Sequence, residues 1–413
     1  MQRALFLIIT ILLLLFVSCE RNKENRAEIY HDSFFLKKVD TLSISLQYIE
    51  NILISKYCVN LNKQDFFIGY TNYVSKVNDL KKEQNDIFLR YNFKTKTVDT
   101  ILNYKIHFEN EIESISDFYL DINNLDTLFL FSSYNLYALN IQTKETRKCN
   151  INYFKENDNE EKIKLGTYFY KTDDVLQSLT LLGNNNFLFS VFNRNISYKD
   201  SKQFLEPIFA IANINTGIGQ KKIFKDTRYP KNYQQGNLYG MGSNINPFGV
   251  FDNKQYYYYG FAKSHNIYRL NTITGKIEEK EIKSKYIGNG WKSMNENDAF
   301  VVDKVNTYNI TEPKYFKLLY DSIHNVIYKF CYHALALKNK DGLFNTLRDK
   351  PFSIQIIDTN LNVLVEIPFK GHTYVPEHAF IDKMGLLNMT INNYKIGDTS
   401  HSYVIQKFEL QGL

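Results

Sequence analysis

A hairpin phrase recurs along this sequence, and it constrains the fold more than any other feature. The phrase is an apolar strand that ends in Asn or Asp, followed by a two-residue spacer, a Thr and then a second strand. Asn or Asp opens such a turn by accepting hydrogen bonds from the backbone that follows it. Repetition over tens of residues is typical of repeat architectures. The five copies are Ile87–Thr95, Leu136–Thr143, Ile208–Gly217, Ile267–Lys276 and the degenerate Ile354–Leu361.

The spacing of these hairpins predicts an all-β fold, a six-bladed β-propeller. Asn92 and Asn140 are 48 residues apart, against roughly 40 to 50 residues for one propeller blade. A further hairpin over residues 315–330 fills the long interval before the last copy and brings the units to six. We expect one domain over residues 39–413, closed by pairing of its N- and C-terminal strands, near residues 42–46 and 404–410, since closure removes exposed strand edges. A pair of β-sandwiches is the alternative, although sandwiches give shorter and less regular spacing.

The first residues have the pattern of an export signal. Arg3 precedes an apolar run over residues 5–15 that suits a signal peptide and is too short for a membrane span. Val17-Ser18-Cys19 resembles the bacterial lipobox, in which cleavage precedes a lipid-bearing cysteine. We therefore expect a signal peptide over residues 1–18, lipidation of Cys19 and a polar tether over residues 19–38. Acids and bases alternate after Cys19, which favours the periplasmic face of the outer membrane over the cell surface.

Composition limits the function only broadly. The chain is 44% hydrophobic, which is enough for a sizeable core, and its net charge of +6 is spread rather than clustered, so we expect no binding to nucleic acid. We also expect a monomer. Cys58, Cys149 and Cys331 are widely spaced in strand-like stretches, where a thiol packs as a small apolar group. Pairing of two of them in an oxidising periplasm stays an alternative.

A glycine-rich segment over residues 236–249 is the candidate ligand-binding loop. It combines flexible glycines with phenol and amide groups, and Tyr239, Asn244 and Asn246 are its candidate ligand-binding residues. The segment lacks the Lys-Ser/Thr pair of a phosphate-binding loop. Glycine and Asn-Pro are also typical of a turn between blades, and that interpretation is the alternative.

No metal or catalytic site is predicted from the remaining motifs. His372, Glu377 and His378 could supply metal ligands, but Pro376 forbids the helix that would align them. Acidic residues could meet in a propeller channel, although no calcium-binding loop marks them. These acidic residues are Asp117, Asp121, Asp126, Asp252 and Asp303.

The run Tyr256–Tyr259 should alternate between the faces of a strand and leave two rings outward.

Three stretches together resemble the Bacteroidota lipoproteins grouped as domain of unknown function 4221. They are residues 115–130, the hairpin from Tyr320 to Lys329, and Lys350–Asp358. The resemblance covers nearly the whole mature chain and implies a TolB-like six-bladed propeller. Ile327 and Lys329 stand where the family pattern has Tyr and Arg. The resemblance implies a location and a fold but no reaction.

The sequence therefore favours a lipid-anchored propeller that binds a protein or glycan partner at the cell envelope, without a cofactor and without catalysis. Function in a propeller resides in its loops rather than in its fold. The main alternative is a metal-dependent hydrolase or lactonase with acidic residues in the channel. A carbohydrate-binding accessory to polysaccharide uptake is a third interpretation.

Overall fold

The computed structural model describes the chain from Phe34 to Gly412 with interruptions. The signal peptide, Cys19 and most of the tether lie outside the described residues, as does Asp121. The described residues are 34–45, 58–61, 64–77, 81–92, 97–105, 117–120, 126–131, 135–140, 142–143, 145–150, 153–154, 163–166, 179–193, 196, 200–216, 222–288, 290–392 and 402–412.

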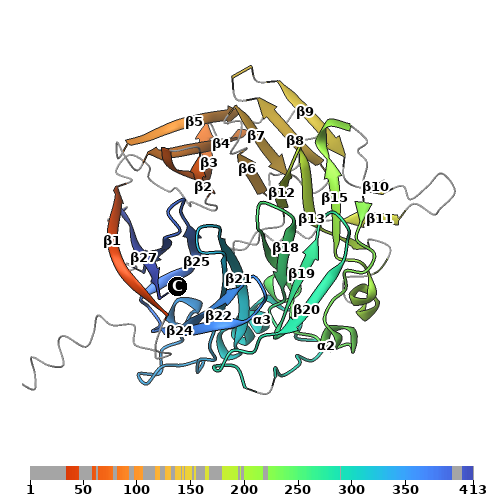
Figure 1. The fold of residues 1–413 in the computed structure, drawn as a ribbon, viewed down its shortest axis with the longest axis vertical. Coiled ribbons are helices and arrows are strands. Elements are labelled where there is room, and N and C mark those ends of the chain that lie inside the picture. Colours follow the sequence, from red (N-terminus) through yellow and green to blue (C-terminus); the bar gives the residue numbers. More distant parts are fainter. Residues whose placement is uncertain are drawn as a thin grey trace, which may run out of the picture.

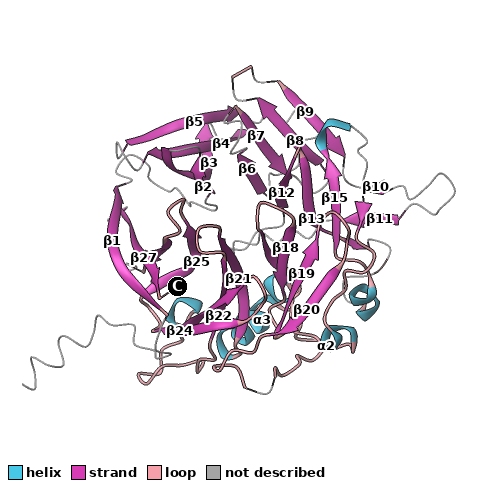
Figure 2. Ribbon diagram, in the orientation of Figure 1, coloured by secondary structure: helices cyan, strands magenta, loops and turns pink. Residues whose placement is uncertain are grey.

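The described strands form six four-stranded antiparallel sheets and one smaller sheet (Figures 1 and 2). The first sheet is β2 (Cys58–Leu61), β3 (Gln64–Val77), β4 (Lys81–Asn92) and β5 (Thr97–Lys105), and the second is β6 (Asp117–Leu120), β7 (Thr127–Phe131), β8 (Asn135–Asn140) and β9 (Thr146–Asn150). The third is β12 (Leu179–Gly183), β13 (Asn186–Ser190), β15 (Phe209–Asn213) and β16 (Lys222–Ile223), and the fourth is β17 (Phe248–Phe251), β18 (Tyr256–Gly260), β19 (Asn266–Asn271) and β20 (Ile277–Glu281). The fifth is β21 (Lys314–Asp321), β22 (Val326–Tyr332), β23 (Phe352–Asp358) and β24 (Val363–Phe369), and the sixth is β25 (Tyr374–Ile381), β26 (Leu387–Ile391), β27 (Ser402–Gln411) and β1 (Phe35–Ser45). The smaller sheet is β10 (Tyr153–Phe154), β11 (Ile163–Gly166) and β14 (Phe192–Asn193).

The recurring phrase marks the same place in each of the first five sheets. All five copies join the third strand to the fourth, so the hairpins predicted from them are confirmed. Asn271 shows the expected turn chemistry, since its Oδ1 accepts the amide N–H groups of Ile273 at 3.0 Å and Thr274 at 2.9 Å. The hairpin over residues 315–330 is also formed, but it joins β21 to β22 within the fifth sheet, so treating it as a separate unit was wrong. The sixth sheet is instead the one that β1 completes.

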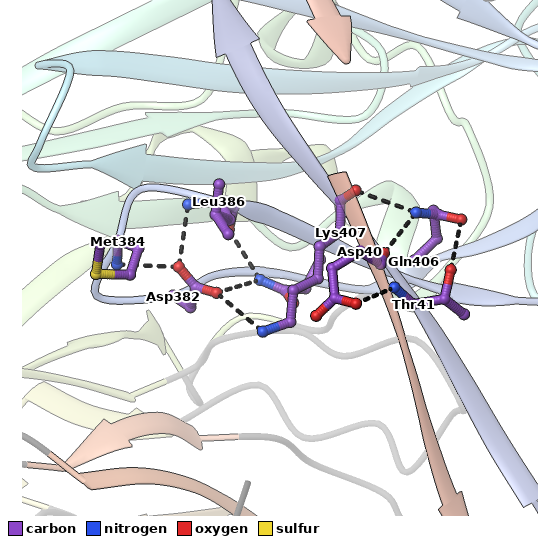
Figure 3. Close-up of polar contacts among 8 residues, drawn as sticks. Asp40, Thr41, Asp382, Met384, Leu386, Gln406 and Lys407 are labelled. Carbon is purple, nitrogen blue, oxygen red and sulfur yellow. Dashed lines mark hydrogen bonds and ion pairs between the residues drawn. The ribbon is translucent and has the colours of Figure 1, made fainter. Parts of the chain in front are cut away.

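The N- and C-terminal strands pair, as the sequence predicts. β1 runs antiparallel to β27 from Phe35 opposite Gln411 to Ser45 opposite Ser402. Figure 3 shows the contact between them, where Thr41 Oγ1 donates to Gln406 Oε1 at 3.1 Å. β1 already begins at Phe35, within the range expected for the tether, because its first residues also find partners on β27.

Separate hydrophobic clusters lie between successive sheets. The second and third sheets share one cluster, the third and fourth another, the fourth and fifth a further one, and the fifth and sixth the last. The third, fourth and fifth sheets are therefore each buried on both faces. Tyr257 and Tyr259 pack toward the third sheet and Tyr258 toward the fifth, so the expectation of two outward rings was wrong. Alternate side chains of a strand point to solvent only when no neighbouring sheet covers that face of the strand.

The connections divide between two faces. The turn face holds the turns after the first and third strands of each sheet, and the loop face holds the other connections. Contacts between neighbouring turns support this assignment, since Lys222 Nζ donates to Ile273 O at 3.1 Å and Arg269 donates to Thr359 O at 2.6 Å. The loop face comprises residues 201–208, 224–247, 261–265, 282–288, 290–313, 333–351 and 370–373.

Most of the short helices lie on the loop face. α3 (Val302–Thr311) has Asp303 in its first turn, where a carboxylate suits the helix dipole, and buries Val305, Tyr308 and Asn309 on one side. Within the described ranges, no helix is long and apolar enough to cross a bilayer. The other helices in the described residues are η1 (Ser201–Leu205), η2 (Ile214–Thr216) on the turn face, α2 (Lys231–Gln234), η3 (Gly242–Asn244) and η4 (Leu347–Asp349).

Candidate functional site

The glycine-rich segment lies inside the loop face, beneath α3. It runs from α2 through η3 into β17, and Gly240 adopts a φ of +91°, which favours glycine. A Cβ at Gly240 would lie 3.1 Å from the side chain of Val305 on α3. Tyr239, Asn244 and Asn246 are all buried here, so they face the interior rather than an open surface. Their role in ligand binding stays a prediction.

The polar groups of this segment are only partly satisfied. Asn244 donates from Nδ2 to Asn309 Oδ1 at 2.9 Å, and its backbone oxygen accepts from the hydroxyl of Tyr233 at 2.7 Å. The side-chain oxygens of Asn244 and Asn246 are buried without a hydrogen-bond partner. An unpaired buried acceptor costs about 1–3 kcal/mol, so these oxygens are where a donor would be accommodated.

Three buried lysines surround the segment. Lys263 Nζ donates to Pro313 O at 2.8 Å and lies 4.6 Å from the ring centre of Tyr308. Lys314 Nζ donates to Ser243 Oγ at 3.1 Å. Burial lowers the pKa of Lys263 well below its ordinary value, and the nearby charges of Lys314 and Lys350 lower it further. Burial, together with Lys314, lowers the pKa of Lys350 to about 7.

These lysines hold the loop face together. The ammonium group of Lys350 donates to three backbone oxygens at the end of α3, those of Asn309 at 2.6 Å, Ile310 at 2.9 Å and Glu312 at 2.8 Å. Cations suit this end of a helix, whose last carbonyls lack partners within the helix. A lysine with a lowered pKa can act as a nucleophile. Here, however, the nitrogens face backbone carbonyls or a serine inside the protein, so the arrangement positions α3 over the segment.

The histidine motif at residues 372–378 does not converge on one point. His372 contacts the carboxylate of Asp349, whereas Glu377 accepts a hydrogen bond from the hydroxyl of Tyr332. Glu377 and His378 are adjacent in β25, in the stretch between Val375 and Phe380 where the register with β26 shifts. Burial lowers the pKa of His378 to about 3, with Lys317 and Arg348 contributing.

The candidate acidic residues are also dispersed. Asp252 uses one side-chain oxygen to accept three backbone amides of its own turn, and Asp303 lies in the first turn of α3. Asp126 accepts a hydrogen bond from Gln142 at 3.4 Å. In the described part of the chain, no group of three His, Cys, Asp or Glu side chains is placed to hold a metal ion. Cys149 and Cys331 are buried and form no disulfide with each other.

The loop face carries large apolar side chains in contact with solvent. Leu343 and Phe344 are 65% and 67% exposed at the tip of the β22–β23 connection. This connection is internally fixed, because Asn339 Oδ1 accepts the amides of Asp341 and Leu343, both at 2.9 Å. A preformed loop loses less conformational entropy when it binds a partner. Further exposed apolar residues on the same face are Leu205, Val301 and Val302.

Sequence reasoning found the glycine-rich segment but missed the lysines. Lys263, Lys314 and Lys350 are far apart in the chain, and only the fold brings them together. One local signal was present, since Lys263 follows Phe261 and Ala262, and Lys314 lies between Pro313 and Tyr315. In such a context, the aliphatic part of a lysine side chain can be buried against apolar groups.

A family model and several solved structures match this chain. The model of the family described as Domain of unknown function (DUF4221) matches residues 33–368. A DUF4221 family member from Bacteroides vulgatus ATCC 8482 has a TM-score of 0.66 and 16% identity, covering 93% of this chain and 100% of its own.

Weaker likenesses are to a luciferin-regenerating enzyme and a tricorn protease, and neither bears on the fold. The first has a TM-score of 0.39 and 8% identity over 91% of this chain and 98% of its own. The second has a TM-score of 0.32 and 13% identity over 81% of this chain and 28% of its own. No curated protein matches the sequence.

Proposed function

The chain belongs to the DUF4221 family, and we propose that it is a lipid-anchored six-bladed propeller whose loop face binds another protein of the cell envelope without catalysing a reaction. The exposed, internally fixed tip at Leu343 and Phe344 is the observation that carries the binding role.

The order and contacts of the sheets support the propeller. Six four-stranded sheets follow one another around the molecule in chain order (Figure 1). The first strands of neighbouring sheets contact each other from β6 to β12, to β17, to β21 and to β25. β1 completes the sixth sheet through its pairing with β27, which leaves β27 without an open edge.

The leader supports the anchor. Its basic, apolar and lipobox-like parts predict lipidation of Cys19, and the alternating charges after Cys19 favour the periplasmic face of the outer membrane. Replacement of Cys19 by Ala should move the protein from the detergent phase to the aqueous phase in a detergent-partition assay. Unchanged partitioning would contradict lipidation.

The loop face supports a protein partner over a glycan. Its exposed side chains at the β22–β23 tip and at the start of α3 are mostly aliphatic, and aliphatic side chains suit a protein interface. A sugar would be expected to stack on aromatic rings. Exposed apolar groups clustered on one face commonly mark an interaction site.

A capture experiment with matched variants tests the partner. The chain from Glu20 onward, coupled to beads, should enrich the same envelope protein as the lipidated form. The double change Leu343→Ser and Phe344→Ser should abolish the enrichment, whereas Ile273→Ser on the turn face should preserve it. Equal enrichment by both variants would contradict the proposal. Binding on a glycan array, or turnover of a lactone with added calcium, would instead favour the glycan or hydrolase alternative.

A further inference from the structure

One backbone geometry repeats on the turn face. In six turns, the residue two places after an Asn or Asp donates its amide N–H to the side-chain oxygen of that residue, at 2.8–3.0 Å. We call this residue the tip position, and its side chain is exposed in all six turns. The tip positions are Gln142, Asn215, Lys254, Ile273, Ile323 and Met384.

The chemistry of the tip position changes around the molecule. The second and third sheets have Gln142 and Asn215 there, and the fourth sheet has Lys254 in one turn and Ile273 in the other. Ile323 and Met384 occupy the fifth and sixth sheets. The hydrogen bond uses the backbone amide, so the turn itself does not require an apolar side chain. Even so, the side chains of Ile273, Ile323 and Met384 are 69%, 56% and 64% exposed.

The apolar tips belong to adjoining sheets. A Cβ at Gly385, beside Met384, would lie 3.0 Å from the side chains of Asp321 and His324 in the turn that carries Ile323. The guanidinium of Arg269, in the strand that leads to Ile273, bonds Thr359 of the fifth sheet. The three apolar tips therefore lie on adjoining sheets, and we call them together the sector. Burial of their exposed apolar surface would be favourable by about 25 cal/mol per Å².

The turns of this sector carry charges of both signs. Asp321 is fully buried, and Asp382 accepts the amides of Met384 and Leu386, both at 3.0 Å, so these two carboxylates are directed into the protein (Figure 3). Lys254 and Lys276 are exposed beside the tips, and Lys276 lies 4.0 Å from the carboxylate of Glu278. A lysine near an anionic lipid surface contributes about 1 kcal/mol to membrane attraction.

The N-terminal end of the domain emerges on the same side. The β25–β26 turn is on the turn face, so β26 runs away from that face. β27 then runs back toward the turn face and ends there at Gln411. Phe35 lies opposite Gln411, so β1 begins at the turn face of the sixth sheet. Sixteen residues, 19 to 34, precede Phe35. They can span at most about 55 Å at roughly 3.4 Å per residue.

We propose that the sector of the turn face with Ile273, Ile323 and Met384 at its tips rests on the headgroup region of the bilayer that holds the lipid of Cys19. This inference depends on the proposed anchor. A shallow contact by apolar side chains flanked by lysines is a known mode of binding at a membrane surface. It leaves the loop face directed away from the membrane, toward a partner.

Tryptophan quenching tests this orientation in the lipidated full chain. The protein is reconstituted into vesicles of phosphatidylethanolamine and phosphatidylglycerol with brominated acyl chains, which quench nearby tryptophans. The chain has a single tryptophan, Trp291, in a loop-face connection, so the unmodified protein supplies the background. Ile323→Trp adds a probe at an apolar tip, and Gln142→Trp adds one at the polar tip of the β8–β9 turn in the second sheet. Met384→Trp is a second probe should the first variant fold poorly.

Ile323→Trp should lose most of its added emission, whereas Gln142→Trp and the unmodified protein should lose little. Flotation of the vesicles reports the anchor separately. Protein that does not float would refute both the anchor and the membrane contact. Protein that floats but is quenched equally in Ile323→Trp and Gln142→Trp would retain the anchor and overturn the orientation. Unquenched tips in a protein that dimerises would assign the sector to a second copy.

Discussion

Truncation of Leu36 in the closing strand β1 should destabilise the whole domain. Leu36 is 6% exposed and belongs to the cluster between the fifth and sixth sheets. Val39, three residues later on the same strand, is 42% exposed. The variants Leu36→Ala and Val39→Ala therefore form a matched pair on one strand.

The magnitude follows from the burial of Leu36. Leu36→Ala removes three carbon atoms from the core, which is worth about 2 kcal/mol at roughly 0.8 kcal/mol per buried group. The cavity that remains raises the expected loss to about 3 kcal/mol. Val39→Ala should change the free energy of unfolding by about 0.5 kcal/mol, as is usual for a surface change.

Urea unfolding of the chain from Glu20 onward measures both changes. Emission from Trp291 is the probe, because this only tryptophan lies far from β1 in sequence and outside the sixth sheet. If β1 closes one cooperative domain, Leu36→Ala should lower the midpoint seen by Trp291 without changing the denaturant slope. An identical midpoint for Leu36→Ala and Val39→Ala would refute the reasoning, because β1 would then unfold independently of the rest.

Three further perturbations test the packing of the loop face and its neighbours. Gly371→Ala should lower the melting temperature by several degrees, because its Cβ would lie 2.0 Å from a backbone oxygen. Gly288→Ala is the control, because a Cβ there would meet nothing within 4 Å. Equal melting temperatures for the two variants would contradict this reasoning. Lys350→Met should cost at least about 3 kcal/mol in urea unfolding, since three carbonyls lose their donor, and Lys340→Met on the surface should cost about 0.5 kcal/mol or less. The pKa of His378 is lowered to about 3 in the folded state from an ordinary 6.5, so the unfolded state binds more protons between these values and stability falls as the pH drops below about 6.5. Replacement of His378 by Gln should remove up to about 1.4 kcal/mol per pH unit from the pH dependence of the free energy of unfolding. An unchanged pH profile would contradict the assignment of this dependence to His378.

Much of the local structure could be predicted from the sequence. The five hairpins follow from turn chemistry, in which an Asn or Asp accepts the next amides, and from alternation in the flanking strands. Pairing of the terminal strands followed from the need to remove strand edges. These features depend on residues that are adjacent in the chain or on a simple rule of sheet closure.

Assignment of strands to sheets needed the tertiary structure. The hairpin over residues 315–330 has the same local pattern as the others, yet it shares a sheet with β23 and β24. Residues 282–313, with α3, and the connection over 333–351 lengthen this part of the chain. Spacing alone therefore counted one hairpin too many and left the sixth sheet uncounted.

The sequence by itself determined the turns, the strand periodicity and the family, because each depends on short-range order along the chain. Tertiary structure alone decided that Tyr257, Tyr258 and Tyr259 would be buried on the two faces of β18. It also decided that Asn244 and Asn246 would lie inside, and that Lys263 and Lys314 would lie close together beneath α3. Burial and charge proximity depend on which distant segments pack together. That packing is set by the cooperative arrangement of all the sheets rather than by any single stretch of residues.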